Sequence, residues 1–494
     1  MSFNLIETTI EQIHAAYKSG ELNCRQLVQM YLDRIEAYDK DGPAINAIIS
    51  LNGNALKEAD RLDAALKSTG LTGPLHGIPI IVKDQADAAG MPTTLGSVLF
   101  RDYYPDRDAF VVDKLKQAGA IILAKATLGE LGGGDTHGSL FGSTKNPYDP
   151  ERTAGGSSGG SGASVSANFC TVAVGQEGFA SIRRPATWNS VAGMRPTAGL
   201  VSRSGVYAGW PSANGSLGPM ARTVTDLAKL LDVMIGYDPD DPITARGVGH
   251  IPKSFTNFLD KEGLRGKRIG ILRESMGYDA DPGSEDFTKI SEVFDKAVAD
   301  LKGAGAEIID PITIPELKAF LAKRATNSND EEESFMLWLN RSENPPYRSR
   351  REAMSKPEFQ KVQKRSRDRW MKTPNDQAHY EYLKAREDLM TRLLQVMADK
   401  NLDAIVHKAV EHQPTLIKDG LNPPFVDQKG APHINTFLVY VPSIVVPAGY
   451  TRDRLPAGVT FLGRPYDDGN MIKLAYAYEQ ATRHRIPPAS VTPL

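Results

Sequence analysis

The chain has 494 residues, of which 41% are hydrophobic and 24% are charged. Its 58 lysines and arginines nearly balance 60 aspartates and glutamates, which leaves a formal net charge of −2. This composition is typical of a globular protein with a large core. It excludes a disordered protein, a coiled coil and a protein that binds nucleic acid or anionic lipid through a strongly charged tail.

Three further features bear on the cellular location. The two cysteines, Cys24 and Cys170, could form one disulfide but are too few for a disulfide framework. Residues 1–7 lack the basic and apolar regions of a signal peptide. Apolar runs such as 78–82 are too short to cross a bilayer. We therefore expect a cytoplasmic protein with no membrane or nucleic-acid partner.

Residues 1–70 are expected to form a helical cover over the rest of the chain. Thr8 and Glu11 have the spacing of a capping box, in which each side chain binds a backbone N–H of the first turn. Asn23 is suited to cap a second helix. The apolar residues of this second helix, between Leu27 and Ile35, fall on one face.

From about residue 75, short apolar runs alternate with helical stretches. The clearest unit is a strand at 268–272, a helix at 284–302 and a strand at 306–309, which predicts a parallel pair with a right-handed crossover. We expect an α/β fold in which a large mixed, mostly parallel twisted β-sheet is covered by helices on both faces. The other strands are predicted at residues 78–82, 121–124, 171–174, 403–406, 443–446 and 458–462.

We expect residues 1–494 to form a single domain. Its core comprises residues 75–310, which carry the chemistry described below, and residues 401–494. Residues 311–400 are expected to form a helical insertion, in which an acidic run and many basic residues are interleaved with aromatic ones. This pattern suits either a lid or anion-binding patch over the core, or a solvated excursion held by a few aromatic anchors.

The densest chemical signal is the Gly- and Ser-rich run 155–162. Such a run is often a flexible linker, but here a polar turn precedes it and a small, apolar stretch follows it. A Gly-rich turn that leads into a buried helix lets backbone N–H groups and hydroxyls converge on one point. A phosphate-binding P-loop would need a lysine after its last glycine, and Ser161 and Gly162 stand there instead.

A candidate nucleophile and a candidate base lie on either side of this run. Ser181 follows a buried strand and small residues, which suits a nucleophile beside backbone N–H groups that bind an oxyanion. It does not lie in a Gly-x-Ser-x-Gly elbow. Lys83 ends the apolar strand 78–82, where burial would lower its pKa toward that of a base. From spacing alone, an ion pair between Lys83 and Asp84 is equally open.

These segments together resemble the amidase signature family of Ser-Ser-Lys hydrolases. The resemblance covers most of the chain outside residues 310–400. It rests on the block Gly156-Ser157-Ser158-Gly159-Gly160, the 24-residue step from Ser157 to Ser181, and residues 77–84, 125–127, 146–149, 181–185, 191–200 and 442–449.

The resemblance implies a role for each matching position. Ser181 would be the nucleophile, Ser157 would relay the proton and Lys83 would be the base. The backbone N–H groups of Gly178, Phe179, Ala180 and Ser181 would form the oxyanion hole. It implies neither a metal nor an organic cofactor, and the dispersed histidines offer no metal-ligand spacing.

The chain departs from the family pattern in two places. Where many members have Thr-Asp and Gly-Gly before the nucleophile, it has Gln176-Glu177 and Phe179-Ala180. Phe179 either forms a wall of the acyl pocket or points into the core. In the segment that would line the substrate pocket, the glycines would widen the pocket or admit the substrate to the backbone; they are Gly132, Gly133 and Gly134.

We expect a stand-alone amidase that hydrolyses a small or aryl-bearing amide through an acyl-Ser181 intermediate. Carbamates and esters are alternative substrates of the same chemistry. The other alternative is an amidotransferase component that hydrolyses glutamine for a partner protein. The expected partner is thus a small amide or carbamate, and a homodimer is plausible for an enzyme of this size.

Overall fold

A computed structural model describes residues 3–212, 215–325 and 330–494. Its framework is an 11-stranded sheet. In order across this sheet, the strands are β1 (Ile48–Leu51), β3 (Ile121–Ala126), β2 (Pro79–Lys83), β8 (Val172–Glu177), β10 (Ser216–Ala221), β9 (Ala192–Arg195), β14 (Ser443–Tyr450), β15 (Pro456–Leu462), β13 (Ala404–Lys408), β11 (Arg268–Leu272) and β12 (Glu307–Ile312).

The sheet is mixed, as expected, and the fold is of the α/β class. Parallel pairing occurs where helices connect the strands, at β3-β2-β8 and at β13-β11-β12. The other neighbouring pairs are antiparallel. Antiparallel pairs are more numerous than the predicted strand-helix-strand units indicate. In the centre of the sheet the neighbouring strands β8, β10, β9, β14 and β15 all pair antiparallel.

The strands predicted from apolar runs are all present, but β1, β9 and β10 were not predicted. Two of these contain glycine or proline in place of a continuous apolar run. The reason is close backbone approach: a Cβ added at Gly218 in β10 would lie 1.9 Å from the carbonyl oxygen of Met194 in β9. Glycine is therefore required inside this part of the sheet.

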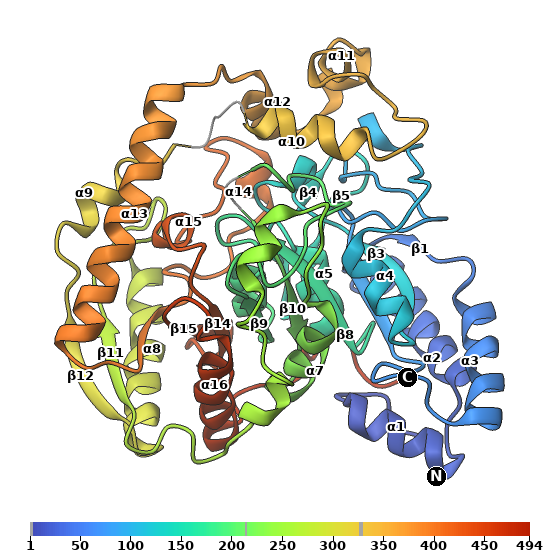
Figure 1. Ribbon diagram of the computed structural model, residues 1–494, viewed down its shortest axis with the longest axis horizontal. Helices are drawn as coiled ribbons and strands as arrows, with labels where there is room; N and C mark the ends of the chain where they lie inside the picture. The colour runs from blue at the N-terminus through green and yellow to red at the C-terminus, as the bar shows by residue number, and fades with distance from the viewer. Residues whose placement is uncertain (1–2, 213–214, 326–329) are drawn as a thin grey trace.

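Helices cover both faces of the sheet (Figure 1). On one face α4, α7, α16 and α8 pack side by side, and on the other α5 and α6 pack together beneath β8, β9 and β10. The bounds are α4 (Phe110–Gln117), α5 (Gly159–Ser166), α6 (Arg183–Trp188), α7 (Val224–Met234), α8 (Glu285–Gly303) and α16 (Asp468–Thr482). Short hairpins precede α5: β4 (His137–Gly138) with β5 (Gly142–Ser143), and β6 (Lys145–Asn146) with β7 (Asp149–Thr153).

The N-terminal cover contains α1 (Ile10–Ser19), α2 (Cys24–Ile35) and a further helix, α3 (Ala55–Thr69). Asn23 caps α2 as predicted. The predicted capping box of α1 is wrong by one residue, because Thr9 and Gln12 form it instead of Thr8 and Glu11. The backbone of Thr8 is held in the core, where its carbonyl accepts a hydrogen bond from Arg222 at 2.8 Å.

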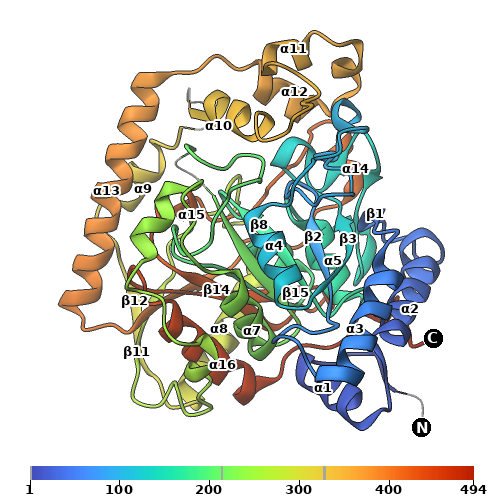
Figure 2. The same ribbon diagram turned by 45° about the vertical axis from the view of Figure 1, so that its right-hand side comes forward.

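The helices α9 to α15 follow β12 along the chain, and β13 of the sheet lies between α13 and α14. Figure 2 shows α10, α11 and α12 together at the top and α13 along one flank. Their bounds are α9 (Leu317–Leu321), α10 (Asp330–Leu339), α11 (Arg350–Met354), α12 (Lys364–Met371), α13 (Asp376–Asp399), α14 (Ile417–Leu421) and α15 (Ile434–Phe437). We call α10 to α12 the lid.

Aromatic side chains fix the lid to the core. Trp338 and Trp370 are buried, and the ring of Phe100 lies 5.9 Å from that of Trp338 and 6.5 Å from that of Trp370. The indole N–H of Trp338 also donates to the carboxylate of Asp87. Aromatic residues therefore anchor the insertion to the core.

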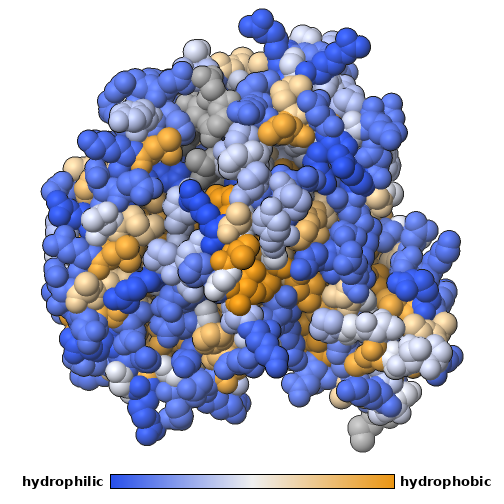
Figure 3. All heavy atoms as spheres, viewed as in Figure 1, coloured by the Kyte–Doolittle hydropathy of each residue, from blue (hydrophilic) through white to orange (hydrophobic). Residues whose placement is uncertain are grey.

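The face of the molecule seen in Figure 1 is mostly hydrophilic, with apolar side chains gathered near its centre (Figure 3). Among the residues that the structure describes, no helix is both long and apolar enough to cross a membrane. Cys24 and Cys170 are both buried free thiols.

The corrected cap of α1 can be tested by substitution. Thr9→Ala removes the side-chain acceptor of the Gln12 N–H and should lower the free energy of unfolding by about 1 kcal/mol. Glu11→Ala is the control, because Glu11 takes no part in the observed capping box. Its exposed side chain makes a long ion pair with Lys229, at 3.9 Å. Urea denaturation measures both. A larger loss for Glu11→Ala would contradict the assignment of the cap.

Candidate active site

Lys83 is the last residue of β2 and is completely buried. Its Nζ atom donates to Ser157 Oγ at 2.7 Å and to the carbonyl of Gln176 at 3.2 Å. Its neighbour Asp84 lies 3.2 Å from Lys125 instead. The ion pair of Lys83 with Asp84 is therefore absent, and among the described residues Lys83 has no carboxylate partner.

The Gly- and Ser-rich run connects β7 to α5 directly above β8. The Gly156–Ser157 peptide bond is cis, and Ser157 is completely buried. The next residue, Ser158, donates its N–H to the carbonyl of Ser181 at 3.1 Å and its hydroxyl to the carbonyl of Gln176 at 3.2 Å. These bonds hold the residue after Ser157 against the turn that carries Ser181, although 24 residues separate the two serines.

Ser181 lies in the tight turn between β8 and α6, and 5% of its surface is exposed. Glu177, at the end of β8, accepts the N–H groups of Ile182 and Arg183 at 2.9 Å each. The Glu177 carboxylate also binds the guanidinium of Arg183 and lies 3.6 Å from Arg195. A longer carboxylate thus still closes the turn that presents Ser181.

The charges in the site have opposite effects on its two ionisable groups. Burial lowers the pKa of Lys83 well below 10.5; Glu177 opposes this shift and Arg369 reinforces it. Burial alone would raise the pKa of Glu177, but the charges of Arg183 and Arg195 more than offset it. The structure therefore favours a neutral amine at Lys83 and a charged carboxylate at Glu177.

The backbone between β8 and α6 carries a row of N–H groups that is open to a ligand. Within the described parts of the chain, no protein acceptor binds an N–H of the following four residues: Gly178, Phe179, Ala180 and Ser181. Phe179 does not adopt the left-handed conformation, so its side chain is accommodated without strain. Backbone N–H groups without a protein acceptor are the kind of donor that can bind an oxyanion.

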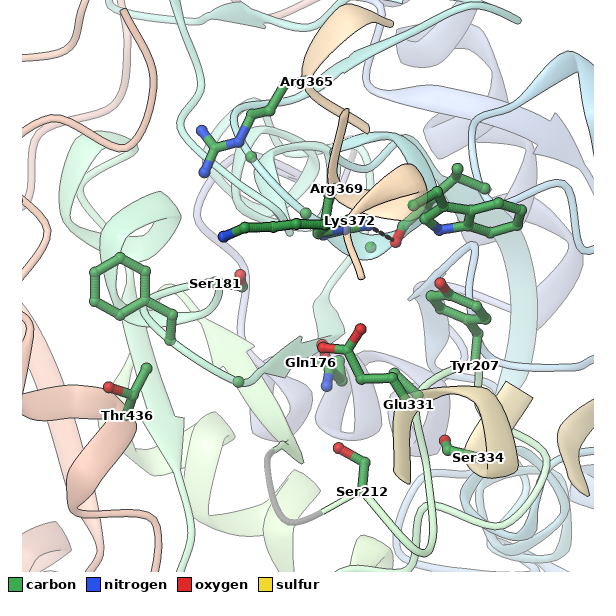
Figure 4. Close-up of a pocket in the computed structure, with 18 of the residues that line it drawn as sticks. Gln176, Ser181, Tyr207, Ser212, Glu331, Ser334, Arg365, Arg369, Lys372 and Thr436 are labelled. Atoms are coloured by element: carbon green, nitrogen blue, oxygen red, sulfur yellow. Dashed lines mark hydrogen bonds between the residues drawn. The ribbon is translucent and has the colours of Figure 1, made fainter. Parts of the chain in front are cut away.

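Ser181 opens into a cavity of about 450 Å³ between the core and the lid (Figure 4). Gly178 and Phe179 line it beside Ser181, and Gly132, Gly133 and Gly134 line it as well. His137 lies outside this cavity, in an adjoining one of about 520 Å³, where its Nδ1 bonds Ser143 Oγ at 2.7 Å.

The glycine run makes room for the lid. A Cβ added at Gly133 would lie 1.7 Å from Nη1 of Arg369, whose guanidinium donates to the carbonyl of Leu131. Gly132 and Gly134 adopt left-handed conformations, with φ of +79° and +83°. These glycines line the cavity as expected, but an arginine of α12 fills the space that they leave.

Comparisons with known proteins agree with this geometry. The Amidase family model matches residues 26–472. A probable amidase of Arabidopsis thaliana is 32% identical, over 99% of this chain and 92% of its own. A glutamyl-tRNA(Gln) amidotransferase subunit of Thermoanaerobacter pseudethanolicus is 31% identical, over 99% of both. The solved structure of native peptide amidase from Stenotrophomonas maltophilia is 33% identical with a TM-score of 0.85, over 99% of both chains.

The chain belongs to the amidase signature family. This amidase is therefore a hydrolase that acts on amides, and its fold is that of the family's solved structures. The identification from the segments around Lys83, Ser157 and Ser181 is confirmed at the level of the family.

Sequence reasoning missed most of the cavity wall of this amidase. The missed residues come from the lid and its flanking residues, from the loop after β9 and from α15, and the sequence signal for those in the insertion was its mixture of charged and aromatic residues. They include Tyr207, Ser212, Arg324, Glu331, Ser334, Arg350, Arg365, Arg369, Lys372 and Thr436. Trp188 does not belong to this wall, because it is buried in the core and donates to the carbonyl of His412.

The role of Glu177 in this amidase can be tested through stability. Glu177→Gln leaves Arg183 and Arg195 buried without a compensating anion and should lower the free energy of unfolding by about 3–5 kcal/mol. The control, Glu58→Gln, breaks the exposed pair with Arg61 and should cost less than about 1 kcal/mol. Chemical denaturation of both variants measures the difference, and equal losses would contradict the structural role of Glu177.

Proposed function

We propose that this chain hydrolyses a carboxamide C–N bond through a covalent acyl-Ser181 intermediate, with Ser157 as proton relay and Lys83 as base. The observation that carries the proposal is the 2.7 Å contact between Lys83 Nζ and Ser157 Oγ in a completely buried setting. A neutral amine there has a lone pair to accept the Ser157 proton, while its own N–H donates to the carbonyl of Gln176.

The proposed reaction begins with two proton transfers. Lys83 takes the proton of Ser157, Ser157 takes that of Ser181, and the Ser181 oxygen forms a bond to the substrate carbonyl carbon. The resulting oxyanion binds the N–H groups of residues 178–181, each such donor being worth about 3 kcal/mol. The relay then returns the proton to the amide nitrogen, which leaves as an amine. Water repeats the steps on the acyl-enzyme and releases the acid.

The cavity supports a small or aryl-bearing amide as substrate. Phe179, Tyr207 and Trp370 line it beside Ser181 and offer apolar, aromatic surface. Carbamates and esters fit the same chemistry. Hydrolysis of glutamine for a partner is the alternative that the likeness to the glutamyl-tRNA(Gln) amidotransferase favours.

The direct test compares wild type with Ser181→Ala on an anilide, a primary amide, an aryl carbamate, an aryl ester and glutamine. Loss of the nucleophile should lower kcat by about 10⁴-fold or more. Release of amine or ammonia measures turnover, and mass spectrometry of the acid-quenched enzyme should find the acyl group on Ser181. The exposed Ser68→Ala is the matched control. Turnover that survives in Ser181→Ala would overturn the proposal, and activity on glutamine alone would favour the amidotransferase.

The pKa of Lys83 predicts the pH profile. Only the neutral amine accepts a proton, so kcat/KM should fall as the pH falls through the lowered pKa of Lys83, well below 10.5. Removing the charge of Arg369 should raise the pKa of Lys83, so Arg369→Met should move the acidic limb of the pH profile to higher pH. Rates across a pH series measure it. The exposed Arg351→Met should leave the limb unmoved, and a limb equally placed in all three proteins would contradict the assignment.

A further inference from the structure

Arg324 is a cavity residue with an unusual environment. It follows α9 and lines the same cavity as Ser181. Its guanidinium carbon lies 3.8 Å above the centre of the Phe179 ring. Its Nε atom is buried without a hydrogen-bond partner, and among the described residues no carboxylate pairs with this guanidinium.

The buried arginines near the site that pair with a carboxylate differ from Arg324 in this respect. Arg183 pairs with Glu177, Arg184 with Asp135 and Arg203 with Asp241. Burial lowers the pKa of Arg324, and the groups that oppose this shift are the phenols of Tyr382 and Tyr278 rather than a carboxylate. Arg324 is partly buried and has no carboxylate partner among the described residues, so its guanidinium is available to an anion that enters the cavity.

Other basic side chains also line the cavity, and one of them, Arg365, pairs with Asp427. Arg365, Arg369 and Lys372 lie along one side of the hollow that Ser181 faces (Figure 4). The two carboxylates of the wall have basic neighbours: Arg350 lies 3.7 Å from Glu331, and Lys364 pairs with Asp368. The whole chain has a formal charge of only −2, so this positive charge is a local property of the cavity.

We propose that the substrate of this amidase carries a carboxylate and that Arg324 binds it. A guanidinium presents parallel N–H groups that match the two oxygens of a carboxylate. The Phe179 ring supports one face of the guanidinium and so directs its edge at the ligand. This inference rests on the proposed hydrolysis at Ser181 and specifies its substrate class as anionic amides.

The proposal explains why a phenylalanine, Phe179, stands in the turn between β8 and α6 that carries Ser181. The N–H of Phe179 belongs to the row of open donors, while its ring carries Arg324 and lies edge-on to His433 at 5.8 Å. One residue therefore contacts both the reacting carbonyl and the group that recognises the carboxylate. Their separation is fixed by a single side chain.

The experiment uses two pairs of substrates in which a neutral nitro group replaces a carboxylate of the same shape. One pair, 4-acetamidobenzoate and 4-nitroacetanilide, places the group on the amine side. The other, 4-carboxybenzanilide and 4-nitrobenzanilide, places it on the acyl side. The readout is the ratio of kcat/KM for the carboxylate to that for the nitro compound, which does not depend on the amount of folded enzyme.

In one of the two pairs, Arg324→Met should lower this ratio by about 10- to 100-fold relative to wild type, since a hydrogen-bonded charge pair is lost. Arg324→Lys keeps the charge but not the paired donors, and should give an intermediate ratio. The matched control is Arg351→Met, because Arg351 is an exposed lid arginine outside the cavity. Ratios that are equal in wild type and Arg324→Met for both pairs would overturn the proposal.

A binding experiment separates the failure of this inference from that of the proposed function. Calorimetric titration of Ser181→Ala protein with the same four compounds gives the carboxylate-to-nitro ratio of affinities without any catalysis. A ratio that falls when Arg324→Met is added supports the carboxylate site even if wild type hydrolyses no anilide. An unchanged ratio overturns the inference, and hydrolysis of the nitro compounds then still upholds the role of Ser181.

Discussion

The site depends on one constraint, which is that Lys83 is buried without a carboxylate partner. A lysine in water is a cation and accepts no proton, whereas burial makes the neutral amine accessible at lower pH. The nearby carboxylates pair with other cations instead: Asp84 pairs with Lys125, and Glu177 pairs with Arg183. If either carboxylate paired with Lys83, the ion pair would stabilise the ammonium form of Lys83, which cannot accept a proton.

The same constraint explains the layout of the sheet around the site. β2 and β8 are parallel neighbours, so Lys83 and Glu177 emerge at the same edge. The Gly- and Ser-rich run crosses above them because α5 packs on both strands. Small residues are needed there: a Cβ at Gly160 would lie 2.4 Å from Thr127 Oγ1. Close packing excludes water from Lys83 and positions Ser157 at once.

The lid supplies what the core lacks. The core holds Lys83, Ser157 and Ser181, while the lid and Arg324 bring charged and aromatic side chains to the cavity beside Ser181. Aromatic contacts such as those of Trp370 and Phe100 hold the lid in place, and Gly133 leaves the space that Arg369 occupies. Chemistry and substrate recognition thus come from different parts of one chain, joined in a cavity at their boundary.

The sequence by itself determined the α/β class and most strands, and it brought forward Lys83, Ser157 and Ser181 as candidates for the chemistry, because these features depend on local patterns. Apolar runs mark buried strands, and a lysine at a strand end or a serine after a glycine turn is visible in a short window. The sequence did not reveal β9 and β10, because their glycines are required by close contacts with other parts of the chain rather than by a local pattern.

Only the tertiary structure decided the partner of Lys83 and the composition of the cavity. Asp84 is adjacent to Lys83 in the chain, yet its side chain points to Lys125, and no local pattern encodes that choice. Arg324 lies 145 residues after Phe179 in the chain. Its guanidinium contacts the Phe179 ring because the residues directly after α9 pack against the turn between β8 and α6. Such pairs depend on how distant elements pack, and packing is a property of the whole chain rather than of any segment.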